Sequence, residues 1–201
     1  MDKTSILEGA DSYWKSMNGC IALDDRWEQE GETPSKKVVK DTILSIPVRE
    51  RNTVMEIGCG SGHIIKLLDS FETYYAVDQS RNMLILCWLR WNRDKRVRCI
   101  ISWNGVDTSA DLILSIEVAQ HQSDPIGYLK SLISKGNFNH FVFTLLVSGL
   151  RTEYGLESGT GSIAVSLEEA DSFVLGMDVK VVTHDSGLVT YVCHYGNMSS
   201  A

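Results

Sequence analysis

The feature that most constrains the fold is a short apolar run, residues 54–57, followed directly by glycines at positions 58, 60 and 62. The apolar run predicts a buried β-strand. The glycines predict a tight turn, because they lack a Cβ atom and tolerate positive φ angles. In residues 63–71 the apolar side chains recur at helical spacing, which predicts an amphipathic helix. We expect the free N–H groups at the start of that helix to face a ligand crevice.

A second apolar run, residues 74–77, ends in Asp78, twenty residues beyond Gly58. A carboxylate at the carboxyl end of a second strand is well placed to accept hydrogen bonds from ribose hydroxyls. Dinucleotide-binding enzymes use G-x-G-x-x-G at the preceding turn. This chain has G-x-G-x-G instead, with His63 where the third glycine would fall and Glu56 two residues before the first. The glycines could alternatively form a plain tight turn in an α/β protein, with no nucleotide site.

The stretch E-I-G-C-G-S-G resembles the first motif of class I S-adenosylmethionine-dependent methyltransferases. Residues 110–121 are similar to the family's fourth-strand segment, D-L-V-x-x-x-x-V-x-x-H, and place His121 just past the strand. The resemblance covers roughly residues 35–195. It implies one α/β domain: a mainly parallel seven-stranded sheet in the order 3-2-1-4-5-7-6, with an antiparallel final hairpin and helices on both faces. Within that domain it implies a helical cap over residues 1–50 and a Rossmann-like core over residues 51–201.

Other segments carry their own local signals. Helical spacing predicts helices over residues 35–46, 80–92 and 124–135, with Ser80 as an N-cap. Ser166 and Glu169 have the spacing of a capping box that opens a further helix. Apolar runs predict strands over residues 97–101, 140–147, 179–183 and 188–193, with another beginning at residue 110.

The resemblance implies S-adenosylmethionine as the cofactor and S-adenosylhomocysteine as its product. The expected cofactor contacts come from the glycine turn and from the ends of the second, third and fourth strands: Glu56, Gly58, Cys59, Gly60, Gly62, Asp78, Gln79, Met83, Ser102, Trp103, Asn104, Ser115, Ile116 and Glu117. Many family members have an acidic residue after the third strand, which holds the adenine amino group. Here Ser102 and Asn104 take its place, and Trp103 can cover the ring, so the adenine contact departs from the family pattern.

Methyl transfer from a sulfonium is an in-line displacement, so the protein's main task is to align the nucleophile with the methyl group. Oxygen nucleophiles also lose a proton, and histidine is the side chain whose unperturbed pKa suits that near pH 7. His121 is therefore the candidate general base; alternatively, it only hydrogen-bonds the loop or the acceptor. Candidate acceptor contacts are aromatic residues of two segments, the leader (residues 1–50) and a glycine-rich loop that could act as a lid (residues 148–165): Tyr13, Trp14, Trp27 and Tyr154. Alternatively, the leader aromatics only cover the sheet.

Metal dependence is not expected. The order Glu117-x-x-Gln120-His121 is similar to the E-x-x-E-H motif of some metal-dependent methyltransferases, but Gln120 replaces the second glutamate. A neutral amide is a weaker ligand for a hard cation than a carboxylate. The five cysteines include no C-x-x-C pair, and their spacing with the histidines matches no zinc signature.

Length and charge limit the possible partners. A chain of 201 residues suits one domain. Its net charge of −7 and sequence pI of about 5.2 argue against nucleic-acid binding, which depends on Lys and Arg neutralising phosphates. The basic stretch 90–98 belongs to a helix-to-strand loop, at the opposite ends of the strands from the ligands, so we expect it to be a solvated helix end. No apolar run approaches a membrane span of about 20 residues, and the N-terminus has no apolar signal core, so we expect a soluble cytoplasmic protein.

The first functional hypothesis is O- or N-methylation of a small-molecule acceptor. One alternative keeps the cofactor and takes RNA or protein as the acceptor, with the basic stretch as its only support. The other is a non-catalytic, methyltransferase-like subunit bound to a partner chain. The sequence carries no signal for the oligomeric state.

Overall fold

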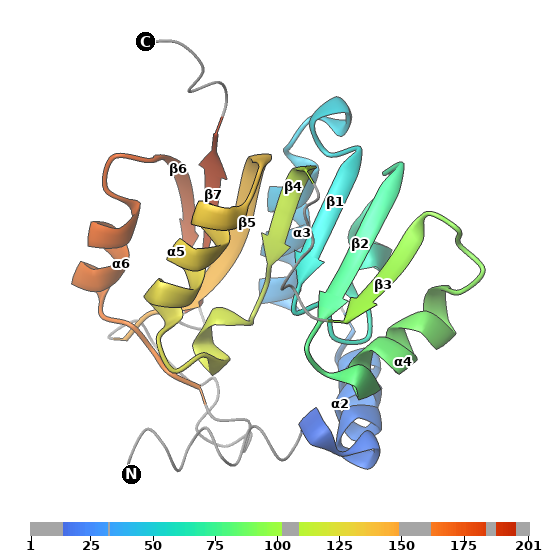
Figure 1. The fold of residues 1–201 in the computed structure, drawn as a ribbon. Helices are drawn as coiled ribbons and strands as arrows, with labels where there is room; N and C mark the ends of the chain where they lie inside the picture. Colours follow the sequence, from blue (N-terminus) through green and yellow to red (C-terminus); the bar gives the residue numbers. More distant parts are fainter. Residues whose placement is uncertain (1–13, 32, 102–108, 149–161, 184–187, 196–201) are drawn as a thin grey trace.

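The computed structural model describes residues 14–31, 33–101, 109–148, 162–183 and 188–195 (Figure 1). Its strands are β1 (Thr53–Ile57), β2 (Thr73–Asp78), β3 (Val97–Ile101), β4 (Ala110–Ser115), β5 (Phe138–Leu146), β6 (Asp178–Thr183) and β7 (Leu188–His194). They form one seven-stranded sheet in the order β3-β2-β1-β4-β5-β7-β6. Strand β7 is antiparallel to both of its neighbours, and the other pairs are parallel. The predicted sheet order is therefore confirmed.

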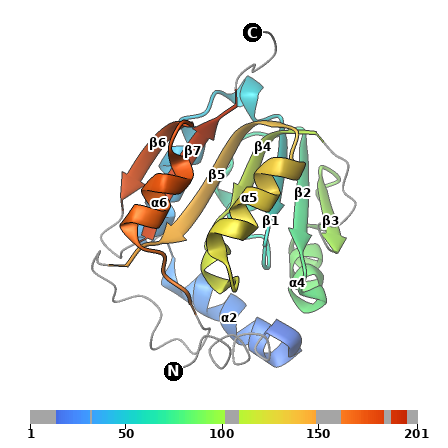
Figure 2. The same cartoon turned by 60° about the vertical axis from the view of Figure 1, so that its left-hand side comes forward.

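Helices cover both faces of the sheet (Figures 1 and 2). They are α2 (Met17–Glu30), α3 (Pro34–Leu44), α4 (Arg81–Trp91), α5 (Pro125–Lys135) and α6 (Leu167–Val174). One apolar layer joins α5 and α6 to the sheet, and the other joins α3 and α4 to it. Successive strand residues enter opposite layers, as the pleat requires: Val54 packs with α3 and α4, and Met55 packs with α5 and α6.

The predicted helix starts are confirmed where a side chain caps them. The Ser80 hydroxyl accepts a hydrogen bond from the backbone N–H of Met83 and opens α4. Asp124 accepts one from Gly127 and opens α5. Ser166 and Glu169 form the reciprocal capping box that opens α6. Each cap satisfies a backbone donor that has no partner inside its helix.

The prediction of a helix over residues 63–71 is wrong. This segment forms only a short 3-10 helix, η2 (Ile64–Leu67), and Leu68 is already extended. Arg51 explains where the helix ends. Its guanidinium is 2% exposed, donates to the carbonyls of Ile46 and Ser70, and pairs with Asp69 at 2.8 Å. A buried guanidinium needs such partners, and they hold residues 69 and 70 in the connection to β2. A single 3-10 turn therefore replaces the expected ligand-facing helix start.

The N-terminal segment divides between two positions. Helix α3 belongs to a sheet-covering layer, with Val39 and Ile43 packed against strand residues. Helix α2 instead contacts α4 and lies at the end of the molecule toward which β1, β2 and β4 point (Figure 1). Two short 3-10 helices, η1 (Val48–Glu50) and η3 (Ala119–His121), precede β1 and follow β4. Among the described residues, no helix combines the length and the apolar character needed to cross a membrane.

Candidate active site

The glycine turn after β1 is tightly packed. Gly58 and Gly60 have φ angles of +79° and +53°, in the left-handed region that glycine adopts without strain. A Cβ atom added at Gly58 would lie 2.3 Å from Val118 Cγ2, and one at Gly60 would lie 3.1 Å from Trp27 Cζ3. The turn thus depends on glycine both for its backbone angles and for the close approach of Val118 and Trp27.

The Asp78 carboxylate holds the glycine turn against the end of β2. Its Oδ2 accepts a hydrogen bond of 2.8 Å from Gly60 N, and its Oδ1 accepts one of 2.7 Å from Ser80 N. Burial raises the pKa of Asp78, while backbone hydrogen bonds from Ser80, Gly60 and Gln79 oppose that rise. A carboxylate has about four acceptor positions, so Asp78 keeps capacity for ribose hydroxyls. Gly60 and Asp78, both predicted as cofactor contacts, are thus joined by a hydrogen bond.

Three other predicted cofactor residues have enclosed side chains. Glu56 is 2% exposed and accepts a hydrogen bond of 2.6 Å from the Tyr74 hydroxyl. Burial raises the pKa of Glu56 to about 8. Cys59 is 5% exposed within the α3–α4 layer, and Met83 is fully buried with Cys20 between α2 and α4. These three side chains therefore have almost no surface open to a ligand.

Helix α2 is fastened to the glycine turn through Asp24, a residue the sequence did not single out. Its carboxylate accepts hydrogen bonds from Ser61 Oγ at 2.5 Å, His63 Nε2 at 2.8 Å and Arg90 Nη2 at 3.0 Å. Burial opposes ionisation of Asp24, but hydrogen bonds from Ser61, Arg90 and His63 keep its pKa below the ordinary value. Burial lowers the pKa of His63, against the effect of Asp24. We call Asp24, Ser61, His63 and Arg90 the α2 clasp.

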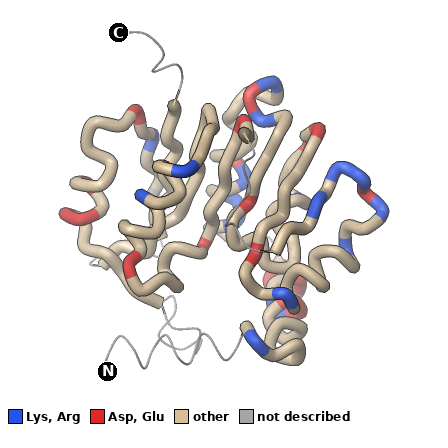
Figure 3. The backbone as a smooth tube through the Cα atoms, viewed as in Figure 1, with Lys and Arg blue, Asp and Glu red and all other residues tan. Residues whose placement is uncertain are grey.

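The basic stretch is only partly the solvated helix end that was expected. Lys and Arg residues gather along the connection from α4 to β3 (Figure 3). Arg96 pairs there with Asp94 and lies over the Phe71 ring. The prediction is wrong for Arg90, whose side chain is 18% exposed and donates to Ser61 O at 2.6 Å as part of the α2 clasp.

The end of β4 holds a residue in an unusual conformation. Glu117 has a φ of +58°, and its N–H donates to Thr144 Oγ1 at 2.6 Å. Left-handed backbone is uncommon outside glycine and tends to cluster at functional sites. Burial raises the pKa of Glu117, against the nearby Lys36 charge. Two residues earlier, Ser115 is fully buried and shares a hydrogen bond of 3.1 Å with the Tyr128 hydroxyl. Ile116, another predicted cofactor contact, lies between them and is partly buried against the α3–α4 layer.

Trp14 and His121 meet just beyond β4. Their ring centroids are 6.0 Å apart, in an edge-to-face arrangement. The Trp14 carbonyl also accepts a hydrogen bond from Ser80 Oγ at 2.9 Å. Trp14 therefore connects the β2 end of the crevice to its β4 end. A predicted acceptor contact and the predicted base lie together, although they are far apart in the sequence.

Comparison with known proteins identifies this arrangement. Residues 55–133 match the family model for a methyltransferase domain. Over this part of the chain, which runs from β1 into α5, the sequence is similar to methyltransferase domains, in agreement with the resemblance of the glycine turn. The matched residues include the glycine turn, Asp78 and the β4 end. None of the curated proteins matches the chain in sequence.

Solved structures of methyltransferases share the fold of this chain. The DhpI–SAH complex has a TM-score of 0.68 at 17% identity, over 94% of this chain and 96% of that one. The N-methyltransferase NodS from Bradyrhizobium japonicum, in complex with S-adenosyl-L-homocysteine, has a TM-score of 0.66 at 14% identity, over 92% and 99%. A SAM-dependent methyltransferase from Aquifex aeolicus has a TM-score of 0.64 at 19% identity, over 89% and 97%. At these identities the likeness concerns the fold.

The residues around the glycine turn suit the family's cofactor. Gly58 and Gly60 form the tight turn that brings Gly60 N to Asp78, and Asp78 has acceptor capacity for a ribose at the end of β2. Five predicted contacts lie outside the described residues. They are the adenine contacts Ser102, Trp103 and Asn104 and the acceptor contacts Tyr13 and Tyr154. In the described part of the chain, no group of three or more His, Cys, Asp or Glu side chains is arranged to hold a metal ion.

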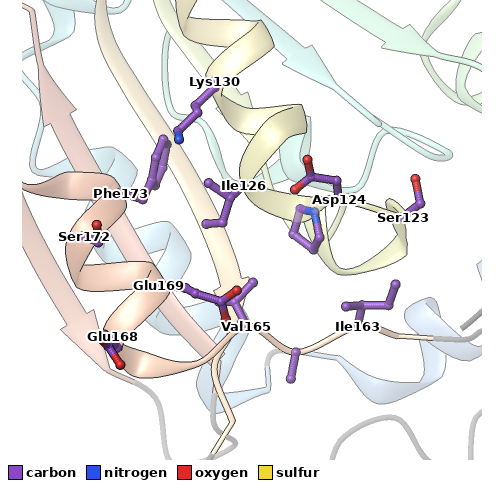
Figure 4. A pocket seen from close by; sticks show the side chains of 12 residues that line it. Ser123, Asp124, Ile126, Lys130, Ile163, Val165, Glu168, Glu169, Ser172 and Phe173 are labelled. Atoms are coloured by element: carbon purple, nitrogen blue, oxygen red, sulfur yellow. The ribbon is translucent and has the colours of Figure 1, made fainter.

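A separate groove of about 550 Å³ lies between α5 and α6 (Figure 4). Ile163 and Val165 border it on the segment that leads into α6, and Phe173 borders it on α6 itself. Its carboxylates include Asp124 and Glu169, which cap α5 and α6. Those two side chains thus stabilise the helices that form the walls of the groove.

Proposed function

We propose that the protein is a class I S-adenosylmethionine-dependent methyltransferase, which moves the methyl group of S-adenosylmethionine to an oxygen or nitrogen atom of a small-molecule acceptor and releases S-adenosylhomocysteine. The observation that carries this proposal is the Trp14–His121 contact at the end of β4. It provides an aromatic surface and an imidazole just beyond β4, and the Trp14 carbonyl is bonded to Ser80, whose N–H donates to Asp78. An aromatic surface suits an organic acceptor, and an imidazole suits removal of its proton.

On this proposal, the cofactor is held by backbone and carboxylate groups of the chain. The glycine turn would contact the methionine part of the cofactor, and Asp78 and Gln79 would contact its ribose. Residues 115–117 would contact the side of the cofactor that faces the acceptor. When bound, the cofactor supplies an electrophilic methyl group on a good leaving group. The protein's contribution is then alignment of acceptor and methyl group, which can supply a large part of the rate enhancement. Helix α2, held on the turn by the α2 clasp, shields that geometry from water.

His121 would act on the acceptor. A general base must come within about 2.6–3.2 Å of the proton-bearing atom, directly or through one water molecule. For a hydroxyl acceptor, His121 would take the proton as the oxygen attacks. For an amine that arrives neutral, orientation alone can suffice, and His121 would position the acceptor.

Cofactor binding is tested by calorimetric titration of Asp78→Ala. The variant should bind S-adenosylmethionine more weakly by about 1–3 kcal/mol, because polar partners of the ribose and of the turn are left unmet. Asp171→Ala on α6, where the side chain is exposed, makes the same change away from the turn and should leave affinity unchanged. Wild-type affinity in Asp78→Ala would contradict the ribose role, and preference for NAD would contradict the cofactor.

Acceptor chemistry is tested by release of S-adenosylhomocysteine across a panel of amines, phenols and carboxylic acids. With an acceptor in hand, His121→Ala should lower kcat by about 10²–10⁴-fold if His121 is a base. The acidic limb of the pH–rate profile should disappear with it, and cofactor affinity should stay nearly constant. A small loss with an unchanged pH profile would leave His121 as a positioning residue. No turnover with any class, together with no cofactor binding, would favour the non-catalytic subunit.

A further inference from the structure

The sulfonium of S-adenosylmethionine carries a positive charge that the product lacks. We propose that the indole of Trp27 lies against this sulfonium and makes the methyltransferase bind its cofactor in preference to its product. The inference rests on the proposed function, because it requires the cofactor to bind at the glycine turn. It gives Trp27, which the sequence placed among the acceptor contacts, a role in cofactor recognition.

The position of the indole is the first support. Trp27 Cζ3 and Cη2 lie 3.1 and 3.3 Å from the point that a Cβ atom of Gly60 would occupy. The N–H of the same glycine is bonded to Asp78, the expected ribose carboxylate. In the cofactor, one methylene group separates the sulfur from the ribose ring. Since the ribose carboxylate and the indole both contact Gly60, the indole lies beside the place that the sulfonium would take.

The charges around the turn are the second support. Glu56 is held largely protonated near neutral pH, because burial raises its pKa to about 8. The Asp24 carboxylate already accepts hydrogen bonds from Ser61, His63 and Arg90. Neither of these two side chains thus offers an uncommitted negative charge to a cation, and the third carboxylate at the turn, Asp78, is assigned to the ribose. An indole face attracts a cation within about 6 Å of its centroid, and tryptophan does so more strongly than tyrosine or phenylalanine.

The fixed position of the ring is the third support. Trp27 lies three residues beyond Asp24 on α2, so the α2 clasp also fixes the part of the helix that carries the indole. Lys36 Nζ donates to the Trp27 carbonyl at 3.2 Å. The Trp27 and His63 rings meet edge to face with centroids 5.3 Å apart. A group held in place before its ligand binds loses less entropy on binding, and Trp27 remains only partly buried.

The test compares three ligands by calorimetric titration: S-adenosylmethionine, S-adenosylhomocysteine and sinefungin, in which a carbon bearing an ammonium group replaces the sulfonium. In Trp27→Leu, the ratio of the product's Kd to the cofactor's Kd should fall by about 2- to 30-fold, the range of a cation–π contact. The ratio of the product's Kd to the Kd of sinefungin should also fall, because sinefungin carries a positive charge at the same place. Trp27→Phe should retain part of the preference. Trp88→Leu, at a side chain 56% exposed on α4, is the matched control and should keep the wild-type ratio.

The readout is a ratio, so a variant that is partly unfolded weakens all three ligands equally and leaves it unchanged. A ratio in Trp27→Leu equal to that of the wild type would overturn the inference and leave Trp27 as a packing residue. The wild type separates this failure from failure of the proposed function. If the wild type binds none of the three ligands, the cofactor assignment itself is wrong.

Discussion

The packing of the glycine turn predicts the effect of a single added methyl group. In Gly58→Ala the new Cβ would lie 2.3 Å from Val118 Cγ2, at a φ of +79°. A left-handed backbone costs a residue with a Cβ about 1–2 kcal/mol. Overpacking an ordered contact costs about 1–3 kcal/mol more. We therefore expect Gly58→Ala to lower the free energy of unfolding by about 2–5 kcal/mol in urea denaturation, the sum of these two costs.

Gly176 separates the two contributions. Its φ is +84°, and an added Cβ would meet nothing within 4 Å, so Gly176→Ala should show only the backbone cost. Adding Val118→Ala to Gly58→Ala removes both methyl groups that cause the contact. The double variant should be less destabilised than the two single changes predict together, with a coupling of about 1–3 kcal/mol. Equal losses in Gly58→Ala and Gly176→Ala, with no coupling to Val118, would refute the claim that the turn is closed by side-chain contact.

Three further predictions concern charge. Burial raises the folded-state pKa of Glu56 to about 8 from an ordinary value of 4.5, so between these values the folded protein keeps a proton that the unfolded chain loses. This group alone should therefore lower stability by up to about 1.4 kcal/mol per pH unit as pH rises through that window, and urea titrations of Glu56→Gln at pH 6 and 8 should lack this contribution. Asp24→Asn should destabilise the protein by about 1–3 kcal/mol in thermal or urea melts, because the α2 clasp loses its charged acceptor, whereas the exposed Asp25→Asn should be near neutral. Generic RNA should show no binding by fluorescence anisotropy near physiological salt; a salt-sensitive, submicromolar complex lost in an Arg93→Ala/Lys95→Ala variant would favour an RNA acceptor.

The parts of the fold that the sequence predicts are those with local signals. Ser80 and the Ser166–Glu169 pair cap helices through residues three positions away, so their spacing is sufficient to locate the helix starts. Asp78 could be expected beside the glycine turn because parallel strands bring their carboxyl ends to one edge of a sheet. The sheet order came from the family resemblance, since apolar runs alone do not determine which strands become neighbours.

The parts that the sequence does not predict depend on partners distant along the chain. The helix expected after the glycine turn ends early because Arg51, which precedes β1, binds Asp69 and the Ser70 carbonyl. Arg90 was expected at a solvated helix end, but in the fold its guanidinium donates to Asp24, a residue of α2. Ion pairs between residues distant along the chain follow from tertiary packing and have no periodic pattern that sequence analysis could detect.

The α2 clasp also has a consequence for how the protein is made. Synthesis proceeds from the N-terminus, so α2 leaves the ribosome before its partners in the clasp exist. Asp24 can reach Ser61 and His63 once the glycine turn has been synthesised, but its ion pair with Arg90 must wait until α4 has been synthesised. A nascent chain that stops before Arg90 therefore has a glycine turn with an incompletely fastened cover. Completion of α4 is thus the earliest step of synthesis at which the α2 clasp can form in full.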